Sequence, residues 1–151
     1  MPLTVRPAAP ADAPVIAEFN RRLAWESEHR QLDMAKLLPG VAAVLGDPSR
    51  GVYFVAESGG EVVGQLAVTY EWSDWRHGWF WWIQSVYVRE DARRAGVFRA
   101  LYHHVADRAR GRGDVIGLRL YVEADNERAR QTYGQLGMAQ TGYLVMERCP
   151  L

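Results

Sequence analysis

Lysine and cysteine are almost missing from this sequence. Lys36 is its one lysine among 18 basic residues. The positive charge is therefore nearly all guanidinium, which favours bidentate contacts with anions, although a bias in genome composition explains the same count. The single cysteine, Cys149, lies two residues before the end of the sequence. One cysteine excludes an intramolecular disulfide, and a nucleophilic thiol is not expected at a chain end that frays.

An excess of charge and a long apolar run are missing as well. Eighteen acidic residues balance the 18 basic ones, so no overall field favours a nucleic acid or an anionic membrane, and any electrostatic function must be local. No run approaches the roughly 20 apolar residues of a membrane span. The first twelve residues lack the cationic start and apolar core of a signal peptide. We therefore expect a cytoplasmic protein with no nucleic-acid or membrane partner.

The spacing of apolar residues and the turn signals predict one α/β domain over residues 1–151. We expect strands at residues 3–6, 52–57, 62–70, 79–88, 115–122 and 141–147. We expect helices from Asp12 through Phe19, in two short pieces within 22–45 broken at Pro39 and Gly40, from Gly96 to about Arg110, and from Asn126 to Gly137. A Gly-Gly turn favours a hairpin of the second and third strands, and the crossover helix favours parallel pairing of strands 79–88 and 115–122.

The connection between strand 79–88 and the next helix suits an anion. Arg93, Arg94, Ala95 and Gly96 lead into a helix whose first N–H groups have no intrahelical partner and whose dipole is positive at that end. A pyrophosphate satisfies both features, and Gly96 would let the backbone come close to it. The alternative is a solvated loop ahead of an ordinary helix.

Two motifs resemble those of one family. Residues 88–101, VREDARRAGVFRAL, resemble the acyl-CoA-binding turn of the GNAT superfamily of N-acetyltransferases, whose pattern is Gln/Arg-x-x-Gly-x-Gly/Ala. Phe98 departs from this pattern, and we expect its ring to turn inward and join the buried stripe of the helix. The second motif, which also resembles the family, is Asn126-x-x-Ala129-x-x-x-Tyr133-x-x-x-Gly137.

The resemblance implies a GNAT fold, an α/β (α+β) arrangement in which about four helices flank a mixed, mostly antiparallel sheet of six to seven strands with a parallel, splayed pair. It implies acetyl-CoA as the cofactor. The residues that would contact it are Val86, Tyr87, Val88, Arg93, Arg94, Ala95, Gly96, Val97, Phe98, Arg99, Asn126 and Tyr133. A backbone N–H near Ser85, Val86 or Tyr87 would meet the charge that develops on the thioester carbonyl. Tyr133 would protonate the leaving thiolate, although helix capping and core packing also explain Asn126 and Tyr133.

The implied reaction is acetyl transfer to a primary amine of a small molecule or peptide. No Ser/His or Cys/His arrangement indicates a covalent intermediate, and no spacing of ligands indicates a metal, so we expect direct attack. Many family members carry a glutamate on the strand before the turn, which this strand lacks. Glu71 and Asp74 are our first candidates for the base and Glu26 and Glu28 the second. A solvated surface carboxylate is the alternative for all four.

Aromatic residues gather ahead of the turn. We expect Trp72, Trp75, Trp82 and Gln84, together with Glu26 and Glu28, to bind the acceptor amine, because aromatic faces and carboxylates attract ammonium groups. A homodimer interface is the rival explanation for the tryptophans. Two alternative functions stay open: a non-catalytic acyl-CoA-binding regulatory module, favoured by Phe98 and the missing glutamate, and a mononucleotide-binding domain, for which no Walker-type lysine is present.

Overall fold

The computed structural model describes residues 2–151, which form two compact units, one reaching to Leu120 and the other comprising Tyr121–Leu151. The first unit contains, in chain order, β1 (Leu3–Pro7), η1 (Pro10–Asp12), α1 (Ala13–Glu28), α2 (Met34–Gly46), β2 (Val52–Ser58), β3 (Glu61–Ser73), β4 (Gly78–Val88), η2 (Glu90–Ala92), α3 (Val97–Arg112) and β5 (Val115–Leu120). The second unit contains α4 (Glu127–Gln135).

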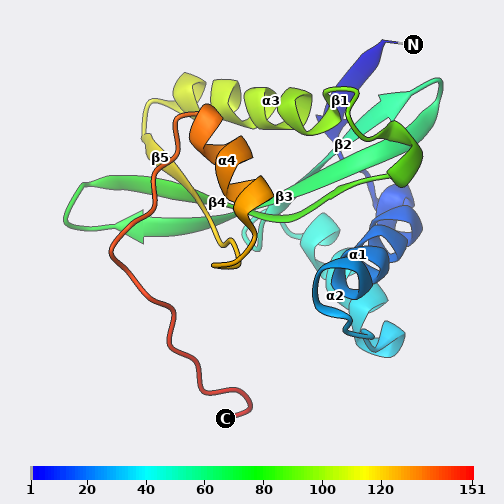
Figure 1. Ribbon diagram of the computed structural model, residues 1–151, viewed down its shortest axis with the longest axis horizontal. Coiled ribbons are helices and arrows are strands. Elements are labelled where there is room, and N and C mark those ends of the chain that lie inside the picture. The colour runs from blue at the N-terminus through cyan, green and yellow to red at the C-terminus, as the bar shows by residue number, and fades with distance from the viewer. Residues whose placement is uncertain (1) are drawn as a thin grey trace. The chain divides into compact units, whose positions relative to one another are not determined.

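The five strands form one mixed sheet in the order β1-β2-β3-β4-β5 (Figure 1). Every neighbouring pair is antiparallel except β4 and β5, which are parallel across the α3 crossover. Gly59 and Gly60 join β2 to β3 with φ values of 60° and 81°, the left-handed pair that a tight hairpin turn requires. The predicted hairpin and the predicted parallel pair are both confirmed.

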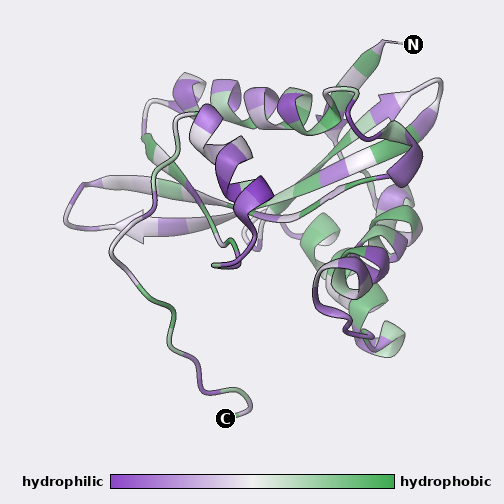
Figure 2. Ribbon diagram, viewed as in Figure 1, coloured by the Kyte–Doolittle hydropathy of each residue, from purple (hydrophilic) through white to green (hydrophobic). Residues whose placement is uncertain are grey.

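Helices cover the two faces of the sheet separately. Helices α1 and α2 pack on one face, around a core that includes Ile16, Val41 and Val55 (Figure 1). Helix α3 lies on the other face, where Leu101 and Val105 are fully buried. Helix α2 is hydrophobic around almost its whole circumference (Figure 2).

The strand count differs from the predicted six to seven. The structure describes residues 141–147 and assigns no strand to them, and β5 ends at Leu120 rather than at residue 122. The segment TGYLVME has the composition of a strand, but a strand exists only where a neighbour pairs with its backbone. Composition does not supply that neighbour.

Two predicted boundaries are wrong. The break between the first two helices lies at residues 29–33, where His29 ends α1 with a φ of 51° and the Asp33 side chain caps α2 by accepting a hydrogen bond from the Ala35 N–H (2.9 Å). Pro39 lies inside α2, because one missing N–H costs less than the cap and the packed face of the helix supply. Strand β3 also continues through Glu71 to Ser73, which shortens the predicted turn at 71–78.

Candidate active site

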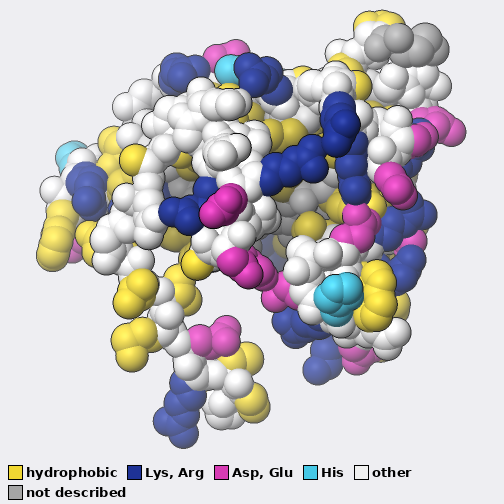
Figure 3. Space-filling model, in the orientation of Figure 1, with side chains coloured by type: hydrophobic (Ala, Val, Ile, Leu, Met, Phe, Trp, Pro, Cys, Tyr) yellow, Lys and Arg dark blue, Asp and Glu magenta, His cyan; other side chains and the backbone are white. Residues whose placement is uncertain are grey.

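The β4–α3 connection ends in a left-handed cap. Gly96 precedes α3 with a φ of 79°, no side chain caps this helix end, and Arg94 is also left-handed at 66°. A Cβ at Gly96 would meet no protein atom within 4 Å. The backbone conformation, rather than crowding, therefore requires glycine here. The first N–H groups of α3 can face an anion, and Figure 3 shows Lys and Arg side chains gathered over this end of α3.

Close packing fixes the start of α3 on the sheet. A Cβ at Gly64 in β3 would lie 2.6 Å from Val97 Cγ1, so glycine lets the helix approach the strand. Val97 is buried, whereas Phe98 is only half-buried, with its ring centroid 6.1 Å from that of Tyr102. The residue that turns fully inward is therefore Val97, and Phe98 borders the buried stripe.

The parallel ladder stops before β4 does. The register between β4 and β5 ends with Ile83 opposite Leu120, while β4 continues to Val88. Ser85 has a φ of 52°, and the pairing with β3 shifts between Gln65 and Ala67. This bulge turns the backbone of β4 just beyond the last pair with β5, so residues 84–88 have no ladder partner in β5.

Glu26 links α1 to the segment between β4 and α3. Its carboxylate accepts hydrogen bonds from the Tyr87 hydroxyl (2.6 Å) and from Arg93 Nη2 (2.7 Å). Arg93 also donates through Nε to the Val88 carbonyl (2.9 Å). The bond from Tyr87 and the Arg93 charge lower the pKa of Glu26, whereas burial and the bond to Glu26 raise the pKa of Tyr87. Arg93 therefore holds the β4–α3 connection against α1.

A second carboxylate is paired on the same face of the sheet. Glu71 Oε1 accepts from Trp82 Nε1 (2.9 Å) and from Arg119 Nη1 (3.1 Å). The Arg119 guanidinium lies 3.6 Å from the centre of the Phe80 ring, close enough for a cation–π contact. Sequence reasoning missed Arg119, because an arginine in an apolar strand gives no sign of its partners.

The other two candidate bases lie apart from this pair. Asp74 belongs to the turn between β3 and β4, where its side chain accepts from the Trp75 N–H (3.0 Å). Glu28 is the last residue of α1 and is exposed. It stands two positions after Glu26, and residues at that spacing do not share a helix face.

The predicted acceptor residues divide into separate places. Trp82 and Gln84 share a face of β4 by strand alternation, and Gln84 donates to Thr69 Oγ1 (2.6 Å). Trp72 follows Glu71 and so points to the opposite face, where its ring centroid lies 5.0 Å from that of Trp79. Trp75 is 88% exposed in the turn. The structure brings Trp82, Gln84 and Glu71 to one face and leaves Trp72 and Trp75 off it.

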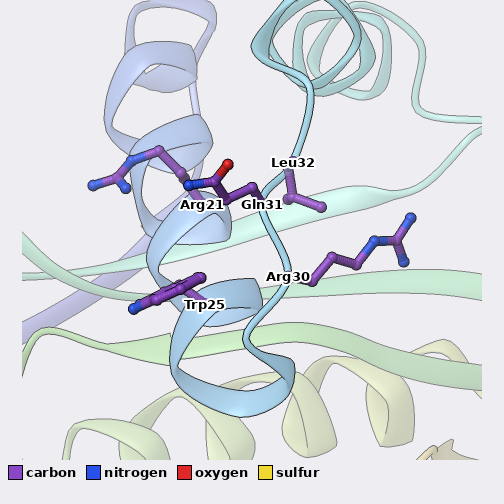
Figure 4. A pocket seen from close by; sticks show the side chains of 5 residues that line it. All are labelled: Arg21, Trp25, Arg30, Gln31 and Leu32. Carbon is purple, nitrogen blue, oxygen red and sulfur yellow. The ribbon is translucent and has the colours of Figure 1, made fainter.

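A pocket of about 250 Å³ lies at the end of α1, lined by Arg21, Trp25, Arg30, Gln31 and Leu32. Figure 4 shows the guanidinium groups of Arg21 and Arg30 pointing to opposite sides. Arg21 is already engaged, because it donates to the Glu18 carboxylate (2.7 and 2.9 Å). The pocket therefore does not direct its two charges at one anion.

The second unit carries the other predicted residues. The Asn126 side chain caps α4 by accepting from the Ala129 N–H (3.1 Å), and Gly137 follows the helix with a φ of 91°. Burial raises the pKa of the Tyr133 phenol. Tyr133 therefore keeps its proton at neutral pH. The predicted helix and its cap are confirmed.

The family follows from a comparison with family models. The model of the acetyltransferase (GNAT) family matches residues 15–138. The chain belongs to this family, which supports an acyltransferase activity, and GNAT enzymes generally use acetyl-CoA and act on amine acceptors.

Solved structures share the fold. A possible acetyltransferase from Clostridium difficile 630 is 42% identical, with a TM-score of 0.93 over 99% of this chain and 98% of that one. A predicted acetyltransferase with acetyl-CoA from Clostridium acetobutylicum is 15% identical, with a TM-score of 0.78 over 97% and 96%. A ribosomal-protein-alanine N-acetyltransferase from Brucella melitensis is 19% identical, with a TM-score of 0.77 over 97% and 100%.

Two further comparisons are negative. No curated protein matches the sequence. Among residues 2–151, no helix is both long and apolar enough to cross a membrane.

Proposed function

We propose that the protein is an N-acetyltransferase, a single domain over residues 1–151, that moves an acetyl group from acetyl-CoA to a primary amine of a small molecule or peptide by direct attack. The observation that carries this proposal is the succession of three features from β4 to α3. The parallel ladder ends at Ile83, a bulge follows at Ser85, and Gly96 forms a left-handed cap at the start of α3. The family match supports it.

The residues present fit the cofactor. The cap at Gly96 and the N–H groups of Val97, Phe98 and Arg99 suit a pyrophosphate, because they are backbone donors at the positive end of a helix dipole. Arg94 and Arg99 are exposed beside this cap and add charge. Arg93 braces the connection through Glu26 and Val88. The free edge of Val86–Val88 suits the amide groups of an extended ligand.

Bound acetyl-CoA supplies the acetyl group as a thioester, whose carbonyl carbon is attacked by the amine nitrogen while the carbon–sulfur bond breaks. The backbone N–H of Val86 donates to the carbonyl oxygen, where negative charge develops. Tyr133 holds a proton at neutral pH and donates it to the thiolate, since an ordinary thiol has a pKa of about 8.5. Asn126 contacts the cofactor as well as capping α4.

The amine must also lose a proton. The contacts of Glu26 with Tyr87 and Arg93 lower its pKa and make it a weak base, and the Glu71 carboxylate accepts hydrogen bonds from Trp82 and Arg119. We propose that both carboxylates attract the ammonium form of the acceptor beside Trp82 and Gln84, and that the proton leaves through water.

Calorimetric titration with acetyl-CoA tests the proposal. We expect a micromolar Kd for acetyl-CoA and about a tenfold weaker Kd for a cofactor analogue that lacks its pyrophosphate, because that group faces the α3 terminus. Dephospho-CoA serves as a control that changes only the ribose phosphate. No binding of acetyl-CoA at millimolar concentration would refute the proposed function.

Tyr133→Phe separates an enzyme from a non-catalytic acyl-CoA-binding module. Amines are first screened with the native protein by release of free thiol. We expect Tyr133→Phe to lower the rate of thiol release by about a hundredfold, as for loss of a general acid, with an unchanged Kd for acetyl-CoA. An unchanged rate would remove Tyr133 from the mechanism. A protein that binds acetyl-CoA and turns over no amine would favour the regulatory module.

A further inference from the structure

A chain of buried polar side chains runs beneath the bulge in β4. Gln65 lies in the middle of β3 with none of its surface exposed, and its Nε2 donates to Asn20 Oδ1 (2.9 Å) and to the Ser85 carbonyl (3.0 Å). Asn20, on α1, is 7% exposed and donates through Nδ2 to the Tyr53 hydroxyl (3.0 Å). These hydrogen bonds therefore connect β2, α1 and β3 to one peptide of β4.

This arrangement carries a cost in stability. Gln65 Oε1 is buried and has no hydrogen-bond partner among the described residues. A buried acceptor left in this state lowers stability and is rare in native proteins. A role other than stability is therefore expected for Gln65.

The peptide that Gln65 holds is the one at the bulge. Ser85 has a φ of 52°, a conformation that costs energy in a residue with a side chain and is kept only where neighbours enforce it. In a trans peptide the C=O and the following N–H point in opposite directions. Because Gln65 draws the Ser85 carbonyl toward itself, the Val86 N–H points away from Gln65. The β5 partner strand has already ended at this level.

We propose that Gln65, held by Asn20, is a positioning residue that orients the Ser85–Val86 peptide so that the Val86 N–H is a fixed donor to the acetyl carbonyl. This inference rests on the proposed function. Sequence reasoning missed both side chains, and the one available signal was a glutamine in the middle of the apolar strand VVGQLAVTY.

The test compares two ligands by calorimetry with the whole protein. Acetyl-CoA carries the carbonyl oxygen, whereas S-ethyl-CoA has a similar shape and lacks it, so the ratio of their Kd values measures the carbonyl contact alone. We expect S-ethyl-CoA to bind the native protein about tenfold more weakly than acetyl-CoA, the effect of one good hydrogen bond. In Gln65→Met we expect the ratio to fall to about one, with the Kd for CoA itself changed less than about twofold.

Two further variants control the result. Val68→Ala removes buried volume from the same strand on the α3 face, so it lowers stability and should leave the ratio at its native value. Asn20→Ala keeps Gln65 and removes one of its two acceptors, so the ratio should fall between the native and Gln65→Met values. This variant decides the question if Gln65→Met does not fold.

The outcomes separate the two proposals. A native ratio in folded Gln65→Met, or in Asn20→Ala, would overturn the role of Gln65. A native protein that binds both ligands equally would also overturn it and would leave the cofactor assignment standing. A native protein that binds neither ligand nor CoA would refute the proposed function itself.

Discussion

The two halves of β4 are built in different ways. Residues 79–83 pair with β3 on one edge and with β5 on the other, and Trp81 and Ile83 are buried on the α3 face. Residues 84–88 pair with β3 alone, contain the bulge at Ser85 and hold polar partners through Tyr87 and the Ser85 carbonyl. The first half resembles the interior of any sheet, and the second resembles a ligand site.

The difference shows how one strand serves both stability and binding. A strand with ladder partners on both edges has few unpaired backbone groups that could bind a ligand. A strand that extends beyond its neighbour presents N–H and C=O groups along an unpaired edge. Substitutions in the first half should therefore change stability, and those around the second half should change cofactor binding. Four predictions, in decreasing order of effect, test this division.

The largest effect is expected at Trp81, which is 6% exposed in the first half. Trp81→Ala should lower the free energy of unfolding by about 4 kcal/mol, because it leaves a large cavity between the sheet and α3. Denaturant unfolding measures this loss. At a temperature where the variant is folded, the Kd for acetyl-CoA should be native, and a Kd weakened more than tenfold would break the proposed division.

Gly64→Ala should affect the second half. Its Cβ would lie 2.6 Å from Val97 Cγ1 and 3.3 Å from the Tyr87 carbonyl, so the start of α3 must move. We expect a loss of about 2 kcal/mol in stability, as for an overpacked core, and about a tenfold weaker Kd for CoA.

Gly46→Ala is the matched control for this variant. A Cβ there meets nothing within 4 Å, and the position lies in α2. It should leave the Kd for CoA unchanged and should not lower stability. Equal affinities for CoA in Gly64→Ala and Gly46→Ala would show that the close approach of α3 to β3 does not matter for binding.

Glu26→Gln should cost about 1 kcal/mol at neutral pH, because it weakens the contacts with Tyr87 and Arg93 at a half-exposed site. The folded pKa of Glu26 is lowered from 4.5, so the native carboxylate stabilises the fold above that pH and loses its contribution as pH falls through the folded value. Unfolding of both proteins between pH 7 and 3 measures the difference between their free energies of unfolding, which should shrink as the pH falls. A difference that grows in acid would contradict the prediction.

The smallest effect is expected for Glu71→Gln. The Glu71 side chain is 45% exposed, and its partners are Trp82 in the first half of β4 and Arg119 in the neighbouring β5. A change of about 0.5 kcal/mol or less in the free energy of unfolding is expected. The KM for the acceptor amine should rise if Glu71 attracts it. A rise in the Kd for acetyl-CoA instead would assign Glu71 to cofactor binding rather than to acceptor binding.

Local features were predicted well because adjacent residues determine them. The Gly-Gly hairpin, the strand before the turn, the start of α3 and the Asn126 cap each depend on a few neighbouring residues. The break between α1 and α2 was misplaced because Pro39 is a strong local signal, and packing of the apolar α2 face against α1 and β2 outweighs it. The strand at 141–147 was predicted from composition, which contains no information about a pairing partner.

The sequence by itself determined the strand, turn and helix around Gly96 and, through its motifs, the family. Only the tertiary structure decided which side chains meet there. The contacts of Glu26 with Tyr87 and Arg93 join residues 61 and 67 positions apart, and the contact of Glu71 with Arg119 spans 48. The Ser85 carbonyl at the bulge accepts a hydrogen bond from Gln65, 20 positions away. Such pairs form only when the strands and α1 pack together, and the pattern of residues along the chain does not record that event.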